Sequence, residues 1–359
     1  MVFFRLFLLP FALLYGMAVF FRNMLFDIGL LPSKQFPVPV ISVGNLRTGG
    51  TGKTPHAEYL IRLLKDKYRV ALLSRGYKRK SKGFKIAGPD SGINDIGDEP
   101  LQMHKKFPGI VVAVHEKRSK GIKLILQKFP DVDVVILDDA FQHRYVKPGL
   151  NLLLTGYYKP FFDDFLLPVG NLREAKCRAK RADALIVTKT PQVFSPLDRR
   201  FFLKKLKKYK LEPVFFSTFR YLDLKPMTTE AKNMEPDSIK SIFLLTGIAN
   251  TTALEEQLKT KCSELYVHNY RDHHQFTGKN LKDLRNHFDK TISFSKIIVT
   301  TEKDAMRLQH PKLLEQLTRL PVFYLPVEVA FHDSDKQKFD KMVFDFLARH
   351  GKVAPAPMK

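Results

Sequence analysis

Tryptophan is missing from this sequence, and only two cysteines occur in its 359 residues. Cys177 and Cys262 are far apart, form no CxxC spacing and have no histidine companions, which excludes a disulfide framework and a zinc site. Acidic residues are scarce: 36 Asp and Glu stand against 60 Lys and Arg, a formal net charge of +24. No repeat is visible, so a solenoid is excluded. We expect a reducing compartment and an acidic partner: nucleic acid, anionic lipid or a phosphorylated substrate.

No apolar run reaches the roughly 20 residues that a bilayer core requires, but one comes near it. From Leu6 to Phe21 the sequence is LFLLPFALLYGMAVFF, closed by Arg22. The basic start is weak and no small-x-small cleavage site follows, which disfavours a signal peptide. Phenylalanines inside the run and basic residues around it are typical of a helix that enters or lies along a membrane interface. We expect an uncleaved anchor over residues 1–25, with a buried core helix as the alternative.

Short β-branched runs alternate with helical patterns from Val38 onward. Such continuous apolar runs indicate strands that are buried on both faces, and their alternation with helices predicts a doubly wound, mostly parallel α/β sheet. The runs are VPVISV, RVALLS, IVVAV, VDVVIL, NLLL and ALIVT.

A second series of strand patterns begins near Ser241 and predicts a smaller C-terminal α/β lobe. It consists of SIFLLTGI, ELYVHNY, KIIVTTEKD and PVFYLPVEV, followed by a helix around residues 336–350. The polar, Pro-containing stretch before it indicates a connection between lobes. We therefore expect a core over 26–222, a connection over 223–238, a C-terminal lobe over 239–350 and a tail over 351–359.

A glycine-rich segment, GNLRTGGTGKT, runs from Gly44 to Thr54 between the first strand and an amphipathic helix. This strand–loop–helix context is what a Walker A phosphate-binding loop requires. The backbone N–H groups would face the phosphates, Lys53 would meet the β and γ oxygens, and Thr54 would offer its hydroxyl to Mg²⁺. Arg47 stands where the general motif has glycine, and Thr48 stands where ParA-type ATPases have their signature lysine.

Two aspartates end the strand VDVVIL, at the sheet edge where α/β folds bind ligands. Asp138 fits a Walker B carboxylate that holds Mg²⁺ opposite Thr54. For Asp139, a metal role and an N-cap role are equally compatible with the pattern.

Two further clusters are ambiguous on their residues alone. In GDEP, Asp98 could accept a proton from an acceptor hydroxyl while Glu99 faces the metal. Acidic residues before a helix more often stabilise it by interacting with the positive end of the helix dipole. In RDHHQF, His273 could orient a carboxylate base, although a cap or salt-bridge role is the commoner use of such a cluster. The segment VTTEKDA, Val299 to Ala305, receives no role.

Taken together, six motifs occur in an order that resembles the tetraacyldisaccharide 4'-kinase family, the lipid A 4'-kinases of Gram-negative bacteria. The motifs are VGNxxxGGTGKTP, LSRGY, GDEP, ILDDAFQHR, NLRE and DHHxF, and the resemblance extends from the apolar N-terminal run to about residue 310. Where the family usually has LREP, this chain has LREA, with Ala175 in place of proline.

The resemblance implies a P-loop NTPase-like kinase with ATP and Mg²⁺ as cofactors, which phosphorylates the 4'-hydroxyl of an acylated glucosamine disaccharide 1-phosphate. It implies ATP binding by Arg47, Thr48, Gly49, Gly50, Thr51, Gly52, Lys53 and Thr54. It gives Asp98, paired with His273, the role of the base, and places Glu99, Asp138 and Asp139 around Mg²⁺. It puts five residues in or near the substrate cleft between the lobes: Gln142, His143, Arg144, Arg173 and Glu174.

On this basis we expect a monomer at the cytoplasmic face of the inner membrane, held by its N-terminal helix. The basic excess then meets anionic lipid headgroups rather than nucleic acid. A partitioning or switch ATPase that binds nucleic acid is the alternative that the charge and the GGTGKT segment leave open. A soluble small-molecule kinase with a buried first helix is a third.

Overall fold

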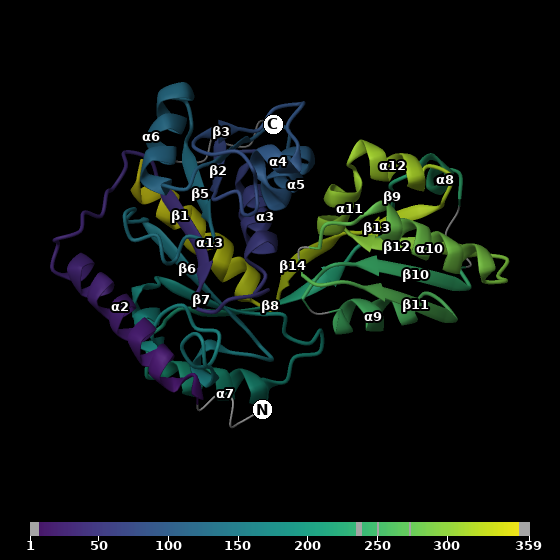
Figure 1. Ribbon diagram of the computed structural model, residues 1–359. Helices are drawn as coiled ribbons and strands as arrows, with labels where there is room; N and C mark the ends of the chain where they lie inside the picture. The colour runs from purple at the N-terminus through teal and green to yellow at the C-terminus, as the bar shows by residue number, and fades with distance from the viewer. Residues whose placement is uncertain (1–6, 235–238, 250, 273, 352–359) are drawn as a thin grey trace. The chain divides into compact units, whose positions relative to one another are not determined.

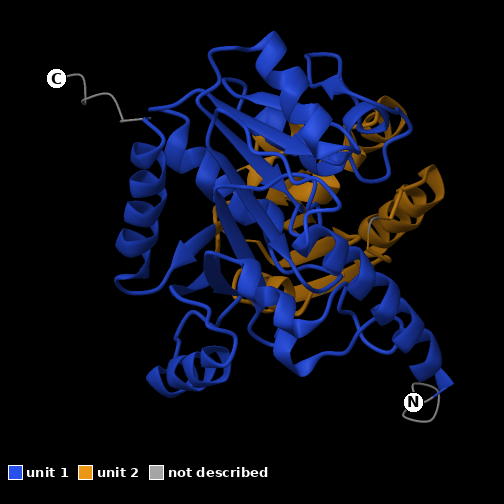
Figure 2. Cartoon of the chain, turned by 90° about the vertical axis from the view of Figure 1, so that its left-hand side faces the viewer, with its two compact units in different colours: residues 1–219, 329–359 blue, residues 220–328 orange. Residues whose placement is uncertain are grey.

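The computed structural model describes residues 7–234, 239–249, 251–272 and 274–351. The chain divides into two compact units. Unit 1 combines the residues up to Phe219 with those from Val329 onward, and unit 2 is Arg220–Glu328 (Figure 2).

Unit 1 is built on a mostly parallel sheet, in which the described strands have the order β14-β8-β7-β6-β1-β5-β2-β4-β3. Neighbours from β8 to β4 pair in parallel, and β3 is antiparallel to β4. The strands are β1 Val40–Asn45, β2 Val70–Ser74, β3 Lys85–Ile86, β4 Val111–Val114, β5 Val134–Asp138, β6 Leu150–Gly156, β7 Ala184–Thr188, β8 Val214–Tyr221 and β14 Val327–Phe331. This confirms the predicted α/β class.

Helices cover both faces of this sheet (Figure 1). Within β1, Ile41 and Val43 enter one core cluster while Val40 enters another, as expected of a strand that is buried on both sides. The described helices of unit 1 are α2 Leu9–Asp27, α3 Lys53–Leu64, α4 Ile93–Ile96, α5 Asp98–Lys106, α6 Arg118–Lys128, α7 Pro196–Lys207 and α13 Asp335–Arg349, with 3-10 turns at Phe161–Asp163 and Lys176–Arg181.

Unit 2 contains a smaller sheet with the strand order β11-β10-β12-β13-β9, again parallel except for the edge strand β9. Its described strands are β9 Lys225–Pro226, β10 Ser241–Thr246, β11 Glu264–Asn269, β12 Lys296–Thr301 and β13 Val322–Leu325. Its described helices are α8 Thr229–Lys232, α9 Thr252–Lys259, α10 Gly278–Lys290, α11 Glu302–Leu308 and α12 Pro311–Leu317.

The units have other bounds than the predicted lobes. The predicted connection over 223–238 falls within unit 2, and its Lys225 and Pro226 pair with β13 in the second sheet. The last helix, α13, belongs to unit 1, because Phe339, Val343 and Phe346 are buried in the same core cluster as β1 and α3. Chain order assigned α13 to the C-terminal lobe, whereas its apolar stripe completes the first sheet's core.

Among the described residues, α2 is the one helix that is long and apolar enough to cross a membrane by length and composition. Most of its apolar side chains are exposed, among them Phe11, Leu13 and Met17. Its buried residues are Ala12 in the first turns and Asn23 and Phe26 near the C-terminal end. A buried core helix, the alternative that the sequence left open, does not describe α2.

Candidate active site

The glycine-rich loop connects β1 to α3, as the sequence predicted. Gly44 is required by a close approach, because a Cβ there would lie 2.7 Å from the backbone nitrogen of Phe141. Gly52, at the start of α3, has a positive φ of 82°. Two side chains fix the loop: Asn45 Nδ2 donates to Thr51 Oγ1 (2.7 Å), and Thr188 Oγ1 donates to the carbonyl of Thr51 (2.8 Å). The loop thus leads into the N-terminus of α3, and the N-terminus of a helix favours anions through its backbone N–H groups and its dipole.

The NLRE segment frames the first half of this loop. Arg173 N donates to the carbonyl of Leu46 (2.8 Å), and Thr48 N donates to the carbonyl of Asn171 (2.8 Å). Arg47, which replaces the glycine of the general motif, bridges Leu172 through its backbone and pairs with Asp164 at 2.5 Å. This stretch is therefore held by strand-like pairing, and the flexibility that a glycine would supply is not needed there.

The acidic pair lies at the end of β5, next to Lys53. Asp138 is 7% exposed, and its Oδ1 has no hydrogen-bond partner. Burial and the neighbouring Asp139 raise the pKa of Asp138 to about 6. Asp139 accepts from both terminal nitrogens of Arg173 (2.9 and 3.3 Å) and lies 3.7 Å from Lys53 Nζ. Burial tends to raise the pKa of Asp139, but Lys53 and Arg173 outweigh it and the pKa is lowered.

The carboxylates of Asp138 and Asp139 fit a metal that is held largely by phosphate oxygens. The described residues contain no group of three or more His, Cys, Asp or Glu that could form a complete metal cage. Mg²⁺ is commonly held by one or two carboxylates together with substrate phosphates, so a complete protein cage is not required. Asp138 presents a buried oxygen without a partner, which is what an incoming cation would satisfy.

Arg118 was missed by the sequence analysis. It follows β4 as the first residue of α6 and is buried. It donates to the carbonyls of His115 (3.0 Å) and Asp138 (3.3 Å). Burial lowers the pKa of Arg118 to about 10, although Asp138 and Asp139 oppose this. The available signal was its place just after a buried strand, at the same sheet edge as the aspartates.

The GDEP motif opens α5 with Asp98, which is buried, and Glu99. Its Gly97 packs on the LSRGY turn, since a Cβ there would lie 3.0 Å from the carbonyl of Tyr77. The LSRGY turn begins at the end of β2, and β2 pairs with β5. Because the carboxyl ends of parallel strands share an edge, the GDEP turn lies at the edge that carries Asp138.

The five predicted cleft residues divide into two groups. Gln142 and Arg173 lie at the phosphate-binding loop: Gln142 Nε2 donates to the carbonyl of Asn45 (2.8 Å), and its Oε1 accepts from Arg173 (3.3 Å). His143 is near the same edge, where burial, followed by Arg118 and Arg75, lowers its pKa to about 4.

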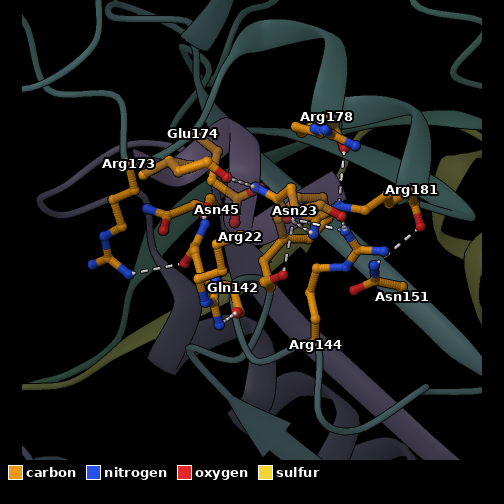
Figure 3. A network of polar contacts seen from close by, with 12 residues as sticks. Arg22, Asn23, Asn45, Gln142, Arg144, Asn151, Arg173, Glu174, Arg178 and Arg181 are labelled. Carbon is orange, nitrogen blue, oxygen red and sulfur yellow. Dashed lines mark hydrogen bonds and ion pairs between the residues drawn. The ribbon is translucent and has the colours of Figure 1, made fainter. Parts of the chain in front are cut away.

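The second group, Arg144 and Glu174, belongs to a polar network at the base of α2 (Figure 3). Arg144 donates to the backbone and side-chain oxygens of Asn23 (2.8 and 3.1 Å) and to Asp27 (2.6 Å). Glu174, 1% exposed, pairs with Arg181 (2.6 Å). We call this network the α2 clasp; its members are Asn23, Asp27, Arg144, Glu174, Arg178 and Arg181.

The clasp is connected to the phosphate-binding loop through two residues. Arg22 of α2 donates to the carbonyl of Gln142 (3.2 Å), and Gln142 in turn contacts Asn45 and Arg173. Tyr15 donates to the carbonyl of Arg173 (2.9 Å). The helix that could enter a membrane is thus joined by hydrogen bonds to the residues that surround Lys53.

In unit 2, the VTTEKDA segment supports the turn at Gly247 that follows β10. Asp304 is fully buried and accepts from Thr246 Oγ1 (3.1 Å), Gly247 N (2.9 Å), Thr301 Oγ1 (2.7 Å) and Arg307 Nη1 (2.6 Å). A Cβ on Gly247 would lie 3.1 Å from His274 Cβ and 3.3 Å from the carbonyl of Arg271. The segment that had no role in the sequence analysis therefore holds the turn against which Arg271 and His274 pack. His273 itself lies outside the described residues.

The sequence was compared with known families and proteins. It matches the family described as tetraacyldisaccharide-1-P 4'-kinase (LpxK) over residues 4–348. It is 46% identical over 352 residues to the tetraacyldisaccharide 4'-kinase of Bacteroides thetaiotaomicron, with 95% of this chain and 92% of that protein covered. It is 46% identical over 349 residues to the enzyme of the same name from Flavobacterium psychrophilum, with 97% and 98% covered.

A solved structure agrees with these sequence matches. The fold resembles LpxK from Aquifex aeolicus, a structure described as an "apo" form in complex with ATP, with a TM-score of 0.71 and 34% identity over 96% of this chain and 99% of that one. The match to the family over nearly the whole chain, together with these relatives, shows that the chain belongs to the tetraacyldisaccharide-1-P 4'-kinase family.

Proposed function

We propose that this chain uses ATP to phosphorylate the 4'-hydroxyl of a tetraacyldisaccharide 1-phosphate in lipid A biosynthesis, with Mg²⁺ and at the membrane surface. The family membership is the support for the class of reaction. One observation carries the site: Lys53, the Asp138–Asp139 pair and Arg173 converge beside the glycine-rich loop. This combination provides positive charge for phosphates and carboxylates for a metal within a few ångströms.

The glycine-rich loop binds the triphosphate in this proposal. Residues Arg47 to Thr54 surround the phosphates, and Lys53 exchanges its partner Asp139 for the β and γ oxygens. Thr54, Asp138, Asp139 and Glu99 are the residues that would hold Mg²⁺, directly or through water. When bound, the ion would supply positive charge that neutralises the charge developing during transfer.

Asp98 acts as the general base; His273, which the family resemblance pairs with it, lies outside the described residues. It takes the proton of the 4'-hydroxyl while that oxygen forms a bond to the γ-phosphorus and the bond between the γ-phosphorus and ADP breaks. Burial of Asp98 at the start of α5 supports this role, because it fixes the carboxylate near the sheet edge of Asp138. Arg118 and Arg173 contribute fixed positive charge to the same edge, which stabilises an anionic transition state.

The helix α2 holds the enzyme at the cytoplasmic face of the inner membrane as a monomer. Its exposed apolar side chains and its length support membrane insertion, and the α2 clasp supports a fixed angle between α2 and the rest of unit 1. A groove of about 420 Å³ between α2 and the loop of residues 164–176 has an almost entirely apolar lining that includes Leu9, Leu13, Phe165 and Leu166. Such a groove suits an acyl chain of the lipid substrate.

The test is an assay with purified full-length protein, ATP, Mg²⁺ and the tetraacyldisaccharide 1-phosphate in detergent micelles. We expect one ADP for each bisphosphorylated lipid formed, and no lipid product from Lys53→Ala. Hydrolysis of ATP without a phosphorylated lipid would contradict the proposal. If DNA stimulated that hydrolysis, the result would favour a partitioning or switch ATPase instead.

A further inference from the structure

Helix α7 has two apolar faces, and the core uses only one of them. Phe202 and Leu206 are buried against the first sheet. On the outer side, Leu197 and Phe201 are spaced four residues apart and are 72% and 49% exposed, while Val193, just before the helix, is 93% exposed. Single apolar residues on a surface are ordinary, but Leu197 and Phe201 lie one helical turn apart and form a short stripe, and Val193 adds a third exposed apolar side chain in the segment before the helix.

Basic residues surround this stripe. Exposed positively charged side chains of α7 and its C-terminal end are Arg200, Lys204, Lys205, Lys207 and Lys208. Lys205 Nζ lies 5.5 Å from the centre of the Phe201 ring. The one acidic residue of the helix, Asp198, accepts a hydrogen bond from Tyr157 (3.0 Å) and is partly buried. An apolar stripe among uncompensated lysines is typical of a helix that lies in the surface of an anionic bilayer.

The position of α7 within unit 1 agrees with this chemistry. In Figure 1, α7 and the N-terminal end of α2 both lie at the lower edge of unit 1, and α6 lies at the upper edge. Exposed apolar side chains of α2 at that end include Leu9, Phe11 and Leu13. One flat apolar phase can therefore contact both helices at once.

We propose that α7 is a second membrane contact, in which Val193, Leu197 and Phe201 enter the interfacial region of an anionic bilayer and the lysines meet lipid phosphates. This rests on the membrane part of the proposed function. One inserted helix leaves a protein free to rotate about that helix, whereas two separate contacts fix one face toward the bilayer. The second contact thus sets the direction in which the candidate active site faces the membrane.

The absence of tryptophan makes a direct test possible. Phe201→Trp gives the full-length protein a single tryptophan on the proposed contact. With vesicles of phosphatidylglycerol and phosphatidylcholine, we expect its emission to shift to shorter wavelength and to be quenched by brominated acyl chains. We expect the quenching to disappear when Leu197→Glu is added, and to weaken as phosphatidylglycerol is replaced by phosphatidylcholine.

The matched control is Gln127→Trp, a single tryptophan at an exposed position of α6, at the opposite edge of unit 1. It should bind the vesicles equally and show no quenching. Sedimentation with vesicles separates the two hypotheses: protein that sediments while Phe201→Trp stays unquenched overturns the α7 contact alone. Protein that fails to sediment overturns the membrane part of the proposed function and the α7 contact with it. A concentration-dependent shift without vesicles would show that a second copy of this chain covers the stripe, which also overturns the proposal.

Discussion

Each unit buries an aspartate at the carboxyl edge of its parallel sheet, but the two carboxylates differ in how many hydrogen bonds they accept. Asp304 in unit 2 accepts four hydrogen bonds, one of them from a buried arginine. Asp138 in unit 1 keeps one oxygen without a partner, and its pKa is raised to about 6. A buried carboxylate with all its hydrogen bonds made stabilises the fold around it. A buried carboxylate with an unpaired oxygen destabilises the folded state, and a ligand that binds this oxygen removes the cost. On this difference we propose that Asp138 is a binding group and Asp304 a structural one.

Asp98 is buried as well, and the substitution Asp98→Ala tests whether it has a functional role, as proposed for Asp138, or a structural one like Asp304. If it is the base, Asp98→Ala lowers kcat by about 10²- to 10⁴-fold while ATP affinity changes little. Lys53→Ala is the matched variant, because it should weaken both turnover and ATP binding. Steady-state kinetics with direct measurement of nucleotide binding distinguishes the two. Unchanged turnover in Asp98→Ala would remove the base assignment.

The substitution Asp138→Asn directly tests whether Asp138 is a binding group. We expect kcat to fall by about 10²- to 10³-fold, because a neutral amide cannot replace the metal-binding carboxylate. The free energy of unfolding should not fall, since the substitution removes an unsatisfied buried charge. Turnover and urea unfolding of the same preparation check both statements. A variant that is inactive because it is unfolded would contradict the distinction between a binding role for Asp138 and a structural role for Asp304.

Asp304→Ala should show the opposite pattern. It removes the carboxylate that pairs with the buried guanidinium of Arg307, so the free energy of unfolding should fall by about 3 kcal/mol. Urea unfolding of the full-length chain measures the loss. The exposed Asp283 of α10 offers the control, because Asp283→Ala should change the unfolding free energy by less than about 0.5 kcal/mol. Equal losses in the two variants would show that the Asp304 network is not what holds the turn.

The raised pKa of Asp138 predicts a smaller effect of pH. Below about pH 6 the carboxyl takes up a proton, so apparent Mg²⁺ affinity should fall by up to about tenfold for each further pH unit. The folded state holds this proton more tightly than the unfolded chain, whose pKa is near 3.8, so the contribution of Asp138 to stability improves as the pH falls from about 6 toward 4. Titrations of Mg²⁺ against pH check the first effect, and Asp138→Asn should show neither.

The strands and the glycine-rich loop could be predicted because their signals are local. A run such as ALIVT is apolar along its whole length, and β7 coincides with it. The context of strand, GGTGKT and amphipathic helix depends on neighbouring residues only, and β1 and α3 confirm it. Asp138 could be placed for the same reason, since it ends a strand.

Other features depend on contacts between distant parts of the chain. Arg118 stands in EKRSKG, which reads as a solvated charged stretch, and only the pairing of the sheet buries it beneath Asp138. The helical pattern of α13 was visible, but its unit was not, because the stripe of Phe339 and Val343 packs on strands almost 300 residues earlier in the chain. Asn23 and Asp27 of the α2 clasp are ordinary polar residues until Arg144, Arg178 and Arg181 reach them.

The most direct test of the central claim is the position of the new phosphate. The full-length enzyme is supplied with ATP, Mg²⁺ and the tetraacyldisaccharide 1-phosphate, and the lipid product is examined by phosphorus and proton NMR. The account predicts a second phosphate monoester on the 4' oxygen of the distal sugar, formed in equal amount with ADP. A phosphate on any other oxygen, or inorganic phosphate as the only product, would contradict it.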